Sequence, residues 1–135
     1  MKIFDEIIRA YPLTERLTPD AALFRVMKKR FVLLWQEPIA KEGIEATLDR
    51  VKATLDKGSA LGWRTVVVVA STKESFESEE LFFFDGVNTF VVFYLIDPEK
   101  KCVYKNDSWI FALGQNYKKV VRRIHAILKP FFPEA

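Results

Sequence analysis

The clearest structural signal in the chain lies in residues 81–112, which read LFFFDGVNTFVVFYLIDPEKKCVYKNDSWIFA. Short aromatic and β-branched runs alternate here with turn-forming residues, as is typical of consecutive strands. The turn residues are DGVN at 85–88, DPEK at 97–100 and NDS at 106–108. The proline at the second position of DPEK suits a type I turn. We therefore expect an antiparallel meander of three or four strands that supplies most of the sheet.

Two apolar runs precede the meander, FVLLWQ at 31–36 and RTVVVVA at 64–70. Their length and composition are typical of strands buried on both faces. Between them, over about residues 38–57, apolar side chains recur at helical spacing, at Ile44, Leu48, Val51 and Leu55. A strand, a helix and a strand in this order predict a βαβ unit with its two strands parallel.

Three further helices are expected. Apolar stripes at helical spacing predict one at residues 2–10 and another at about 116–129. A third is expected at 18–30, because Thr18 can cap its amino end and Pro19 suits its first position. Two phenylalanines, Phe131 and Phe132, follow the last helix, and we expect them to tuck under the domain rather than to dangle, with docking on a partner as the alternative.

Together these elements predict one domain, residues 1–135, of the α+β class, with a mixed α/β arrangement as the alternative. A chain of this length is typical of a single domain and can bury one core without disulfides or metals. We expect a two-layer sandwich. Its mixed sheet would have about five strands and contain the βαβ unit and the meander, and the helices, including the C-terminal one, would pack mainly on one face.

The composition is that of a globular protein with a small positive charge. Half of the 135 residues are hydrophobic, and the net charge is +3, which permits an anionic partner without requiring one. Cys102 is the only cysteine, so an intrachain disulfide and a four-cysteine zinc site are excluded. The acidic start of the chain does not read as an export signal, and no apolar run is long enough to span a membrane. We expect a cytoplasmic protein without a cofactor. A nucleotide-binding fold in particular is not expected, because the glycine-rich phosphate loops are missing from the sequence.

Aromatic residues suggest a binding surface on the sheet. The consecutive residues Phe82, Phe83 and Phe84 must point to opposite faces of a strand. A small domain has few helices with which to cover both faces, and an uncovered aromatic face is a typical interaction surface. If both faces are covered, every ring belongs to the core instead. Our first hypothesis is a non-enzymatic module that binds a protein partner or a second copy of itself, as a homodimer, through Phe83, Phe93, Trp109 and Phe111.

The final helix supplies an alternative. Five positive charges and no acid lie between Asn116 and Lys129, and four of the basic residues fall opposite the apolar side, namely Lys118, Lys119, Arg122 and Arg123. Such a face can bind phosphate groups regardless of sequence, or it can be the solvated side of an ordinary amphipathic helix. The alternative hypothesis is therefore a nucleic-acid-associated protein. A third is a small-molecule-binding domain with an apolar pocket between sheet and helices.

The sequence nominates no catalytic residue. Asp85 followed by Glu99 and Lys101 has the acid and acid-x-lysine pattern of metal-dependent nucleases, but Glu99 falls in a turn where the pattern needs a strand. His125 is the only histidine and lies at the border of the apolar side of the final helix, with no nucleophile assigned to it. Cys102 is expected to point to the core as a small apolar residue. We therefore favour a protein that is not an enzyme, without a metal site.

Overall fold

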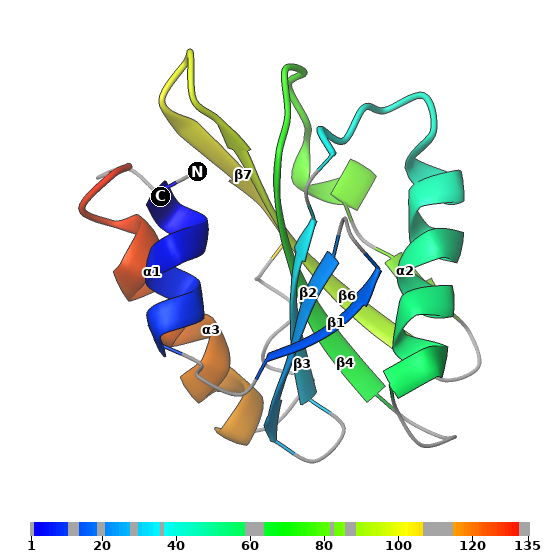
Figure 1. Cartoon of the computed structure of the whole chain (residues 1–135). Coiled ribbons are helices and arrows are strands. Elements are labelled where there is room, and N and C mark those ends of the chain that lie inside the picture. Colours follow the sequence, from blue (N-terminus) through cyan, green and yellow to red (C-terminus); the bar gives the residue numbers. More distant parts are fainter. Residues whose placement is uncertain are drawn as a thin grey trace.

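A computed structural model of the chain describes residues 2–10, 14–18, 21–27, 30–35, 37–58, 64–81, 83–85, 89–106 and 115–132. Figure 1 shows the elements along the chain. They are α1 (Lys2–Ala10), β1 (Thr14–Thr18), β2 (Ala21–Met27), β3 (Arg30–Trp35), α2 (Ile44–Gly58), β4 (Arg64–Ser71), the short 3₁₀ helix η1 (Ser78–Leu81), β5 (Phe83–Asp85), β6 (Thr89–Asp97), β7 (Cys102–Lys105) and α3 (Gln115–Leu128).

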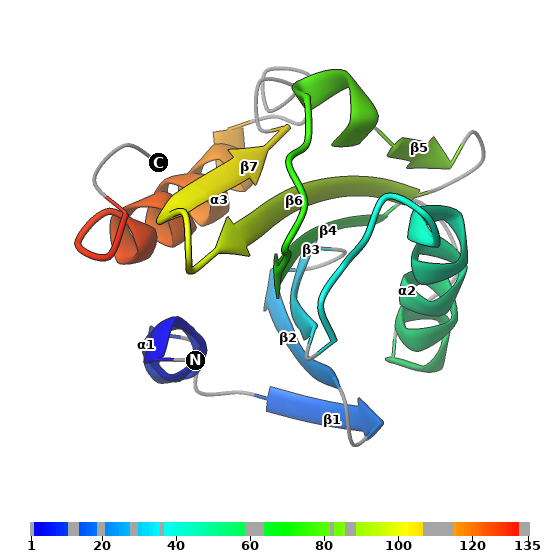
Figure 2. The ribbon, with the colours of Figure 1, turned by 90° about the horizontal axis from the view of Figure 1, so that it is seen from above.

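The strands of the described residues form one mixed sheet of seven strands, in the order β1-β2-β3-β4-β6-β5, with β7 also paired to β6. The central neighbours β3, β4 and β6 are parallel. The remaining pairs are antiparallel, and Figure 2 shows the sheet from above. The predicted βαβ unit is confirmed as β3–α2–β4. Both β5 and β7 pair antiparallel with β6, but the expected meander that supplies most of the sheet is wrong, because β4 occupies one edge of β6 and the two short strands share the other. The predicted combination of helices with a mixed sheet is therefore confirmed.

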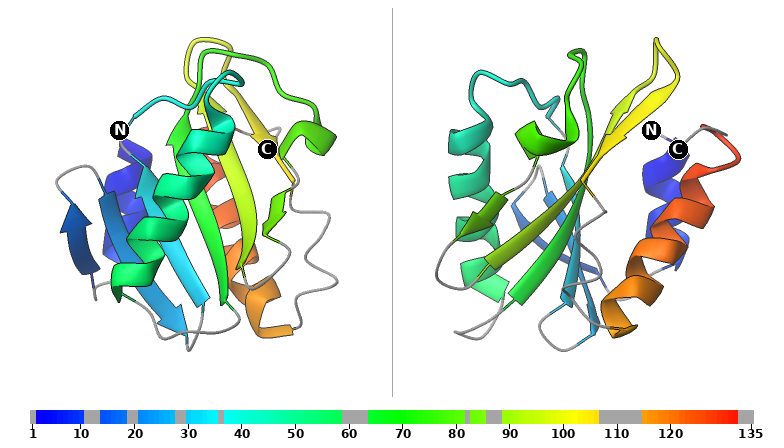
Figure 3. Two further views of the ribbon diagram at one scale, coloured as in Figure 1. Left: turned by 90° about the vertical axis from the view of Figure 1, so that its right-hand side faces the viewer. Right: turned by 180° about the vertical axis from the view of Figure 1, so that it is seen from behind.

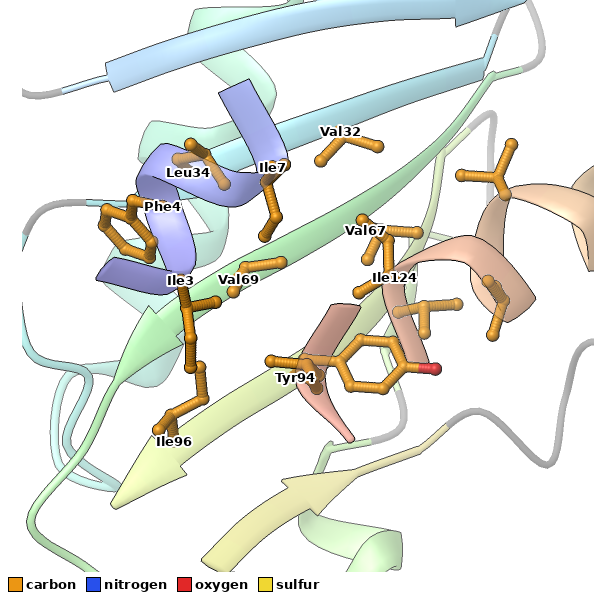
Figure 4. Close-up of a cluster of buried hydrophobic side chains, with 14 of the residues drawn as sticks. Ile3, Phe4, Ile7, Val32, Leu34, Val67, Val69, Tyr94, Ile96 and Ile124 are labelled. Carbon is orange, nitrogen blue, oxygen red and sulfur yellow. The ribbon is translucent and has the colours of Figure 1, made fainter. Parts of the chain in front are cut away.

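Helices cover both faces of this sheet. On one face, side chains of the strands pack with α1 and α3 in a cluster that contains Ile7, Val32, Val67, Tyr94 and Ile124 (Figure 4). On the other face, side chains that alternate with these pack with α2 in a second cluster, which contains Leu33, Val51, Leu55, Val68 and Phe93. The sheet thus lies between two helical layers (Figure 3). We call them the α3 side and the α2 side.

The expected two-layer arrangement, with the helices mainly on one face, is therefore wrong. The described side chains of β3, those of β4 up to Ala70, and those of β6 from Val91 onward are all buried. Parallel strands that are apolar at almost every position must be covered from both directions. Each large side chain that is fully buried contributes about 1.5–3 kcal/mol relative to exposure, so an uncovered face of these strands would lose several such contributions.

β1 and β2 pair as the strands of an antiparallel hairpin, and the residues described within 18–30 all lie in strands, so the helix expected there is wrong. Thr18 pairs with Ala21 at one end of the hairpin, and β2 pairs with β3 along its whole length. Because β3 is buried on both faces, its backbone needs a hydrogen-bonding partner at each edge, and β4 occupies only one edge. This tertiary requirement outweighs the local cap signal at Thr18. It also raises the number of strands above the five that we expected.

The other helices begin and end close to the predicted residues, except for the start of α2. That helix begins at Ile44, later than expected, because the preceding segment runs along the end of β4. The Ile39 N–H donates to the Ser71 carbonyl at 2.9 Å, and the Ile39 carbonyl accepts from Thr72 Oγ1 at 2.7 Å. Gly43 has φ 121°, a left-handed value that favours glycine, directly before the helix. Within the described residues, no helix combines the length and apolar character needed to cross a membrane.

The side chain of Asn106 joins two short strands that share one edge of β6. β5 pairs with the first part of β6 and β7 with the last part. Between them, Oδ1 of the buried Asn106 accepts from the Phe93 N–H at 2.6 Å. Its amide group donates to the carbonyls of Leu81 and, at 3.3 Å, of Val91. Asn106 therefore supplies hydrogen bonds to buried backbone groups at the point between the two short strands.

Candidate functional site

α3 presents a row of basic side chains to solvent. Lys119, Arg122, Arg123 and Lys129 are exposed, and we call them the basic stripe. The Lys129 N–H donates to the His125 carbonyl at 3.0 Å, so the residue continues the helical turn. Lys118, which was also predicted, lies in α3, but its side chain is outside the described residues. The opposite side of the helix is fixed in the core by Val120, Val121, Ile124 and Leu128.

The spacing of the basic stripe suits a row of phosphate groups. Positions 119, 122, 126 and 129 are three or four residues apart, so they lie along one side of the helix, with the small exposed residue Ala126 between the basic ones. At 1.5 Å per residue the stripe is about 15 Å long. One strand of duplex DNA carries a phosphate about every 3.4 Å along the axis. The stripe can therefore lie against about four phosphates.

The positive charge of α3 is not balanced within the helix. Its sequence, QNYKKVVRRIHAIL, contains four basic residues and no acid. The neighbouring helix α1 adds the exposed carboxylate of Asp5 and an ion pair in which Arg9 Nη1 lies 2.9 Å from Glu6 Oε1. Among the described residues of these two helices, the acidic side chains thus belong to α1, whereas the charged side chains of α3 are all basic.

The aromatic residues predicted to bind a partner are not brought together at the surface. Phe93 is completely buried in the cluster beneath α2, so its prediction as a contact residue is wrong; the cause is the second helical layer. Phe83 belongs to β5, but its side chain is outside the described residues, as are Trp109 and Phe111 altogether. For these three residues the predicted role stays a prediction.

The residues of the nuclease pattern lie at opposite ends of β6. Asp85 pairs with Thr89, the first residue of β6, whereas Glu99 and Lys101 follow Asp97, its last residue. Eight steps of about 3.3 Å along a strand separate those ends by about 26 Å. Carboxylates this far apart cannot hold the same metal ion. Nor does the described part of the chain contain a group of three or more potential metal-binding side chains of the His, Cys, Asp or Glu type.

The only histidine and the only cysteine are both half-buried. His125 lies on α3 between the buried side and the basic stripe, as its position in the helical pattern predicts. Cys102, at the start of β7, is half-buried rather than part of the core. The expectation that it points fully inward is therefore wrong, and the reason is that the short edge strand β7 has every side chain half-buried.

A second polar region lies where β3, β4 and β6 end. The carboxyl ends of parallel strands meet at one edge of the sheet, which is where α/β proteins commonly hold ligands. The Lys41 N–H donates to Glu74 Oε2 at 2.7 Å, and Lys41 Nζ lies 3.2 Å from Glu80 Oε2. A hydrogen bond from the Glu77 backbone N–H and the contact with Lys41 lower the pKa of Glu80. These contacts tie the loops after β3 and β4 together.

Ser75 lies at the centre of this region. Its Oγ is 3.1 Å from the Tyr104 hydroxyl and accepts a hydrogen bond from Lys100 Nζ at 3.2 Å. The Tyr104 ring packs at a tilt against Phe76, 6.2 Å between centroids. A serine beside a lysine can be a nucleophile, but lysines that act as bases are desolvated, whereas Ser75 and Lys100 are exposed. We interpret the cluster as a clamp between loops. Sequence reasoning missed it because its members come from separate segments without a shared motif.

An ion pair with good geometry completes the α2 side. Arg50 on α2 donates to both carboxylate oxygens of Glu37, at 2.9 and 3.1 Å. Its guanidinium also lies over the ring of Trp35, 4.9 Å from the centroid, which adds a cation–π contact. The hydrogen bond and the charge of Arg50 hold the pKa of Glu37 below its ordinary value.

Comparisons of the chain with protein-family models, with curated proteins and with solved structures gave no match.

Proposed function

We propose that this protein binds nucleic acid without acting on it as an enzyme, and that the basic stripe of α3 contacts the phosphate backbone. The observation that carries the proposal is the unbalanced charge of α3, whose exposed side is basic along about 15 Å. The rigid attachment of the helix also supports it, because cations on a fixed scaffold lose less conformational freedom on binding. Such contacts recognise phosphate and carry no sequence information of their own.

The expected binding is weak and depends strongly on salt. Non-specific complexes of this kind have Kd values of about 10⁻⁴–10⁻⁶ M at physiological salt. With about four phosphate contacts, the logarithm of the affinity should fall with the logarithm of the salt concentration with a slope of about −3 to −4. Each contact should then make the affinity at 0.1 M salt higher than that at 1 M salt by between about a half and one order of magnitude.

The test replaces three of the stripe residues together, Lys119, Arg122 and Arg123, by glutamine. Binding of a labelled oligonucleotide, followed by fluorescence anisotropy at low salt, should weaken by about 100-fold, and the salt slope should become shallower by about two to three units. All three side chains are exposed, so we expect the variant to fold. Wild-type protein that shows no salt-dependent binding would end the proposal.

A matched control removes the same charge elsewhere. Lys41, Lys52 and Lys73 lie on α2 or in the loops after β3 and β4, and their replacement by glutamine also lowers the net charge of +3 to zero. If binding only reflects overall charge, the two triple variants will lose affinity equally. The proposal requires that the control variant retain most of its affinity.

Binding of a protein partner or of a second copy is the other hypothesis carried over from the sequence. With Phe93 in the core, it depends on Phe83, Trp109 and Phe111. The native mass at low and high salt, measured by light scattering, tests self-association. A dimer that is insensitive to salt and is weakened by Trp109→Ala would favour this hypothesis over nucleic-acid binding.

A further inference from the structure

Phe131 stands out among the described side chains as the exposed large hydrophobic one, with 38% of its surface accessible. It lies two residues after Lys129, the last member of the basic stripe. Figure 1 shows the turn, in red, at the end of α3 and on the far side of the sheet from α2. A single exposed phenylalanine is ordinary by itself, so its meaning depends on how it is held and on what surrounds it.

The turn holds the backbone of Phe131 in place from both sides. The N–H groups of Phe131 and Phe132 both donate to the Leu128 carbonyl, at 3.0 and 2.9 Å. The next residue, Phe132, is buried in the cluster beneath α1 and α3. The ring of Phe131 is therefore presented to solvent from an anchored turn rather than from a loose tail.

Electrostatics explain why an aromatic residue suits this end of the basic stripe. The last carbonyls of a helix carry partial negative charge, so beyond the cation of Lys129 a neutral group suits this end of the helix better than another phosphate. A nucleic-acid base is neutral and has a flat face that stacks on aromatic rings whatever its identity. Cations along the helix followed by a ring at its end thus match a strand whose phosphates lie on α3 and whose terminal base stacks on the ring.

We propose that Phe131 is a stacking platform and that the ligand of the basic stripe is single-stranded nucleic acid. This inference rests on the proposed function, and it adds the class of strand that is bound. A duplex keeps its base faces stacked inside the helix, so it can use the cations of the stripe but not the ring. Preference for a single strand over a duplex is therefore the property that Phe131 should control.

The experiment measures affinity for a thymidine twelve-mer and for a twelve-base-pair duplex at equal salt, using the full chain and three variants. Phe131→Ala should weaken single-strand binding by about 10-fold and leave duplex binding unchanged. Phe131→Leu, which keeps an apolar side chain without a π face, should behave like Phe131→Ala. Phe131→Trp should retain binding, and the fluorescence of the new indole should be quenched by the single strand.

Each result separates this inference from the proposed function. Equal affinity of wild type and Phe131→Ala for the single strand, with binding still lost in the triple glutamine variant, overturns the stacking role and leaves phosphate binding intact. If the wild type binds neither the single strand nor the duplex, both this inference and the proposed function are overturned. Thermal unfolding of each variant, with a midpoint close to that of wild type, shows that a loss of affinity is not a loss of fold.

Discussion

The two helical layers each cover an apolar face of the sheet, but their helices differ in charge. α2 contains three acidic and three basic residues, whereas α3 contains four basic residues and no acid. On the α2 side, Arg50 is paired with Glu37 and Lys41 with Glu80. On the α3 side, the exposed row along the helix has one sign. Both helices are anchored by apolar side chains, so packing alone does not account for the charge of α3.

This comparison indicates where function and where structure reside. Surface ion pairs such as that of Arg50 and Glu37 typically contribute about 0–1 kcal/mol, and on the α2 side they fix loops to each other. A row of like charges contributes repulsion instead, by a few tenths of a kcal/mol for each neighbouring pair. α3, in which this repulsion between like charges is present, is therefore a better candidate than α2 for contact with an anionic partner.

The largest expected effects are on stability, and they test whether both helical layers are integral parts of the fold. Leu55 beneath α2 and Ile124 beneath α3 are both completely buried. Leu55→Ala and Ile124→Ala should each lower the free energy of unfolding by about 3 kcal/mol, because each leaves a cavity in a packed core. Urea denaturation measures both. A value below about 1 kcal/mol for one of them would show that its layer is not an integral part of the fold.

The next prediction tests whether the edge of β6 that Asn106 joins can open locally while the α3 side stays folded. Asn106→Ala should lower the free energy of unfolding by about 2–3 kcal/mol, because it removes the hydrogen bonds that the Asn106 side chain makes to buried backbone groups of Phe93, Leu81 and Val91. Hydrogen exchange should speed up first at the Phe93 amide and in β5, while the amides of α3 keep their protection. Simultaneous loss of protection in α3 would show that the edge joined by Asn106 and the α3 side open as one unit.

A single charge reversal sharpens the contrast between the sides. Arg122→Glu removes one phosphate contact and adds repulsion, so nucleic-acid affinity should fall by at least about 10-fold. Lys73→Glu makes the same change in net charge in the exposed loop after β4 and should change affinity by less than about 3-fold. Equal losses in an anisotropy titration would contradict a site on α3.

The smallest effect is a dependence on pH that belongs to the α2 side. The pKa of Glu37 is lowered by Arg50 and that of Glu80 by the Glu77 N–H and Lys41. Because these pKa values are lower in the folded state, the ion pairs stabilise it fully above the ordinary glutamate pKa, 4.5, and this stabilisation is lost as the pH falls through the lowered values. Titration of the carboxylates of Glu37 and Glu80, followed by NMR, measures whether their pKa values are lowered in the folded protein.

Replacement of Glu37 by glutamine provides the control for that titration. The variant should show a weaker fall in melting temperature between pH 5 and pH 3 (about two pH units around the ordinary glutamate pKa), because one of the titrating pairs is removed. An unchanged profile would mean that Glu37 does not contribute to the acid sensitivity.

The secondary structure of segments with a clear apolar pattern could be predicted from the sequence. The secondary structure of segments that depend on pairing with other parts of the chain could not. The apolar stripes of α1 and α3 and the apolar runs of β3 and β4 carry their own signal. β1 and β2 instead contain a helix cap signal at Thr18, and they are strands because β3 needs a second partner. The sequence likewise shows many apolar residues in β6 but not that two helical layers share them.

The same distinction applies to the candidate site. The basic side of α3 follows from helical spacing, so Lys119, Arg122 and Arg123 could be predicted. The exposure of Phe131 could not, because two consecutive phenylalanines after a helix give no period that decides which one is buried. Contacts among loops, such as that of Ser75 with Tyr104, join residues 29 positions apart and have no local pattern at all.

The shared edge of β6 also affects how this protein behaves when crowded with its own copies. Exposed strand edges are templates on which other chains can add, and long, flat edges promote aggregation most. Here that edge is divided between β5, of three residues, and β7, of four, with the side chain of Asn106 where a continuous strand would run. Lys105 ends β7, and charged residues on edge strands discourage pairing with a second chain. Substitution of Asn106 should therefore have two effects that both favour aggregation. It lowers the stability of the fold, and it leaves a longer stretch of the β6 edge accessible to a neighbouring molecule.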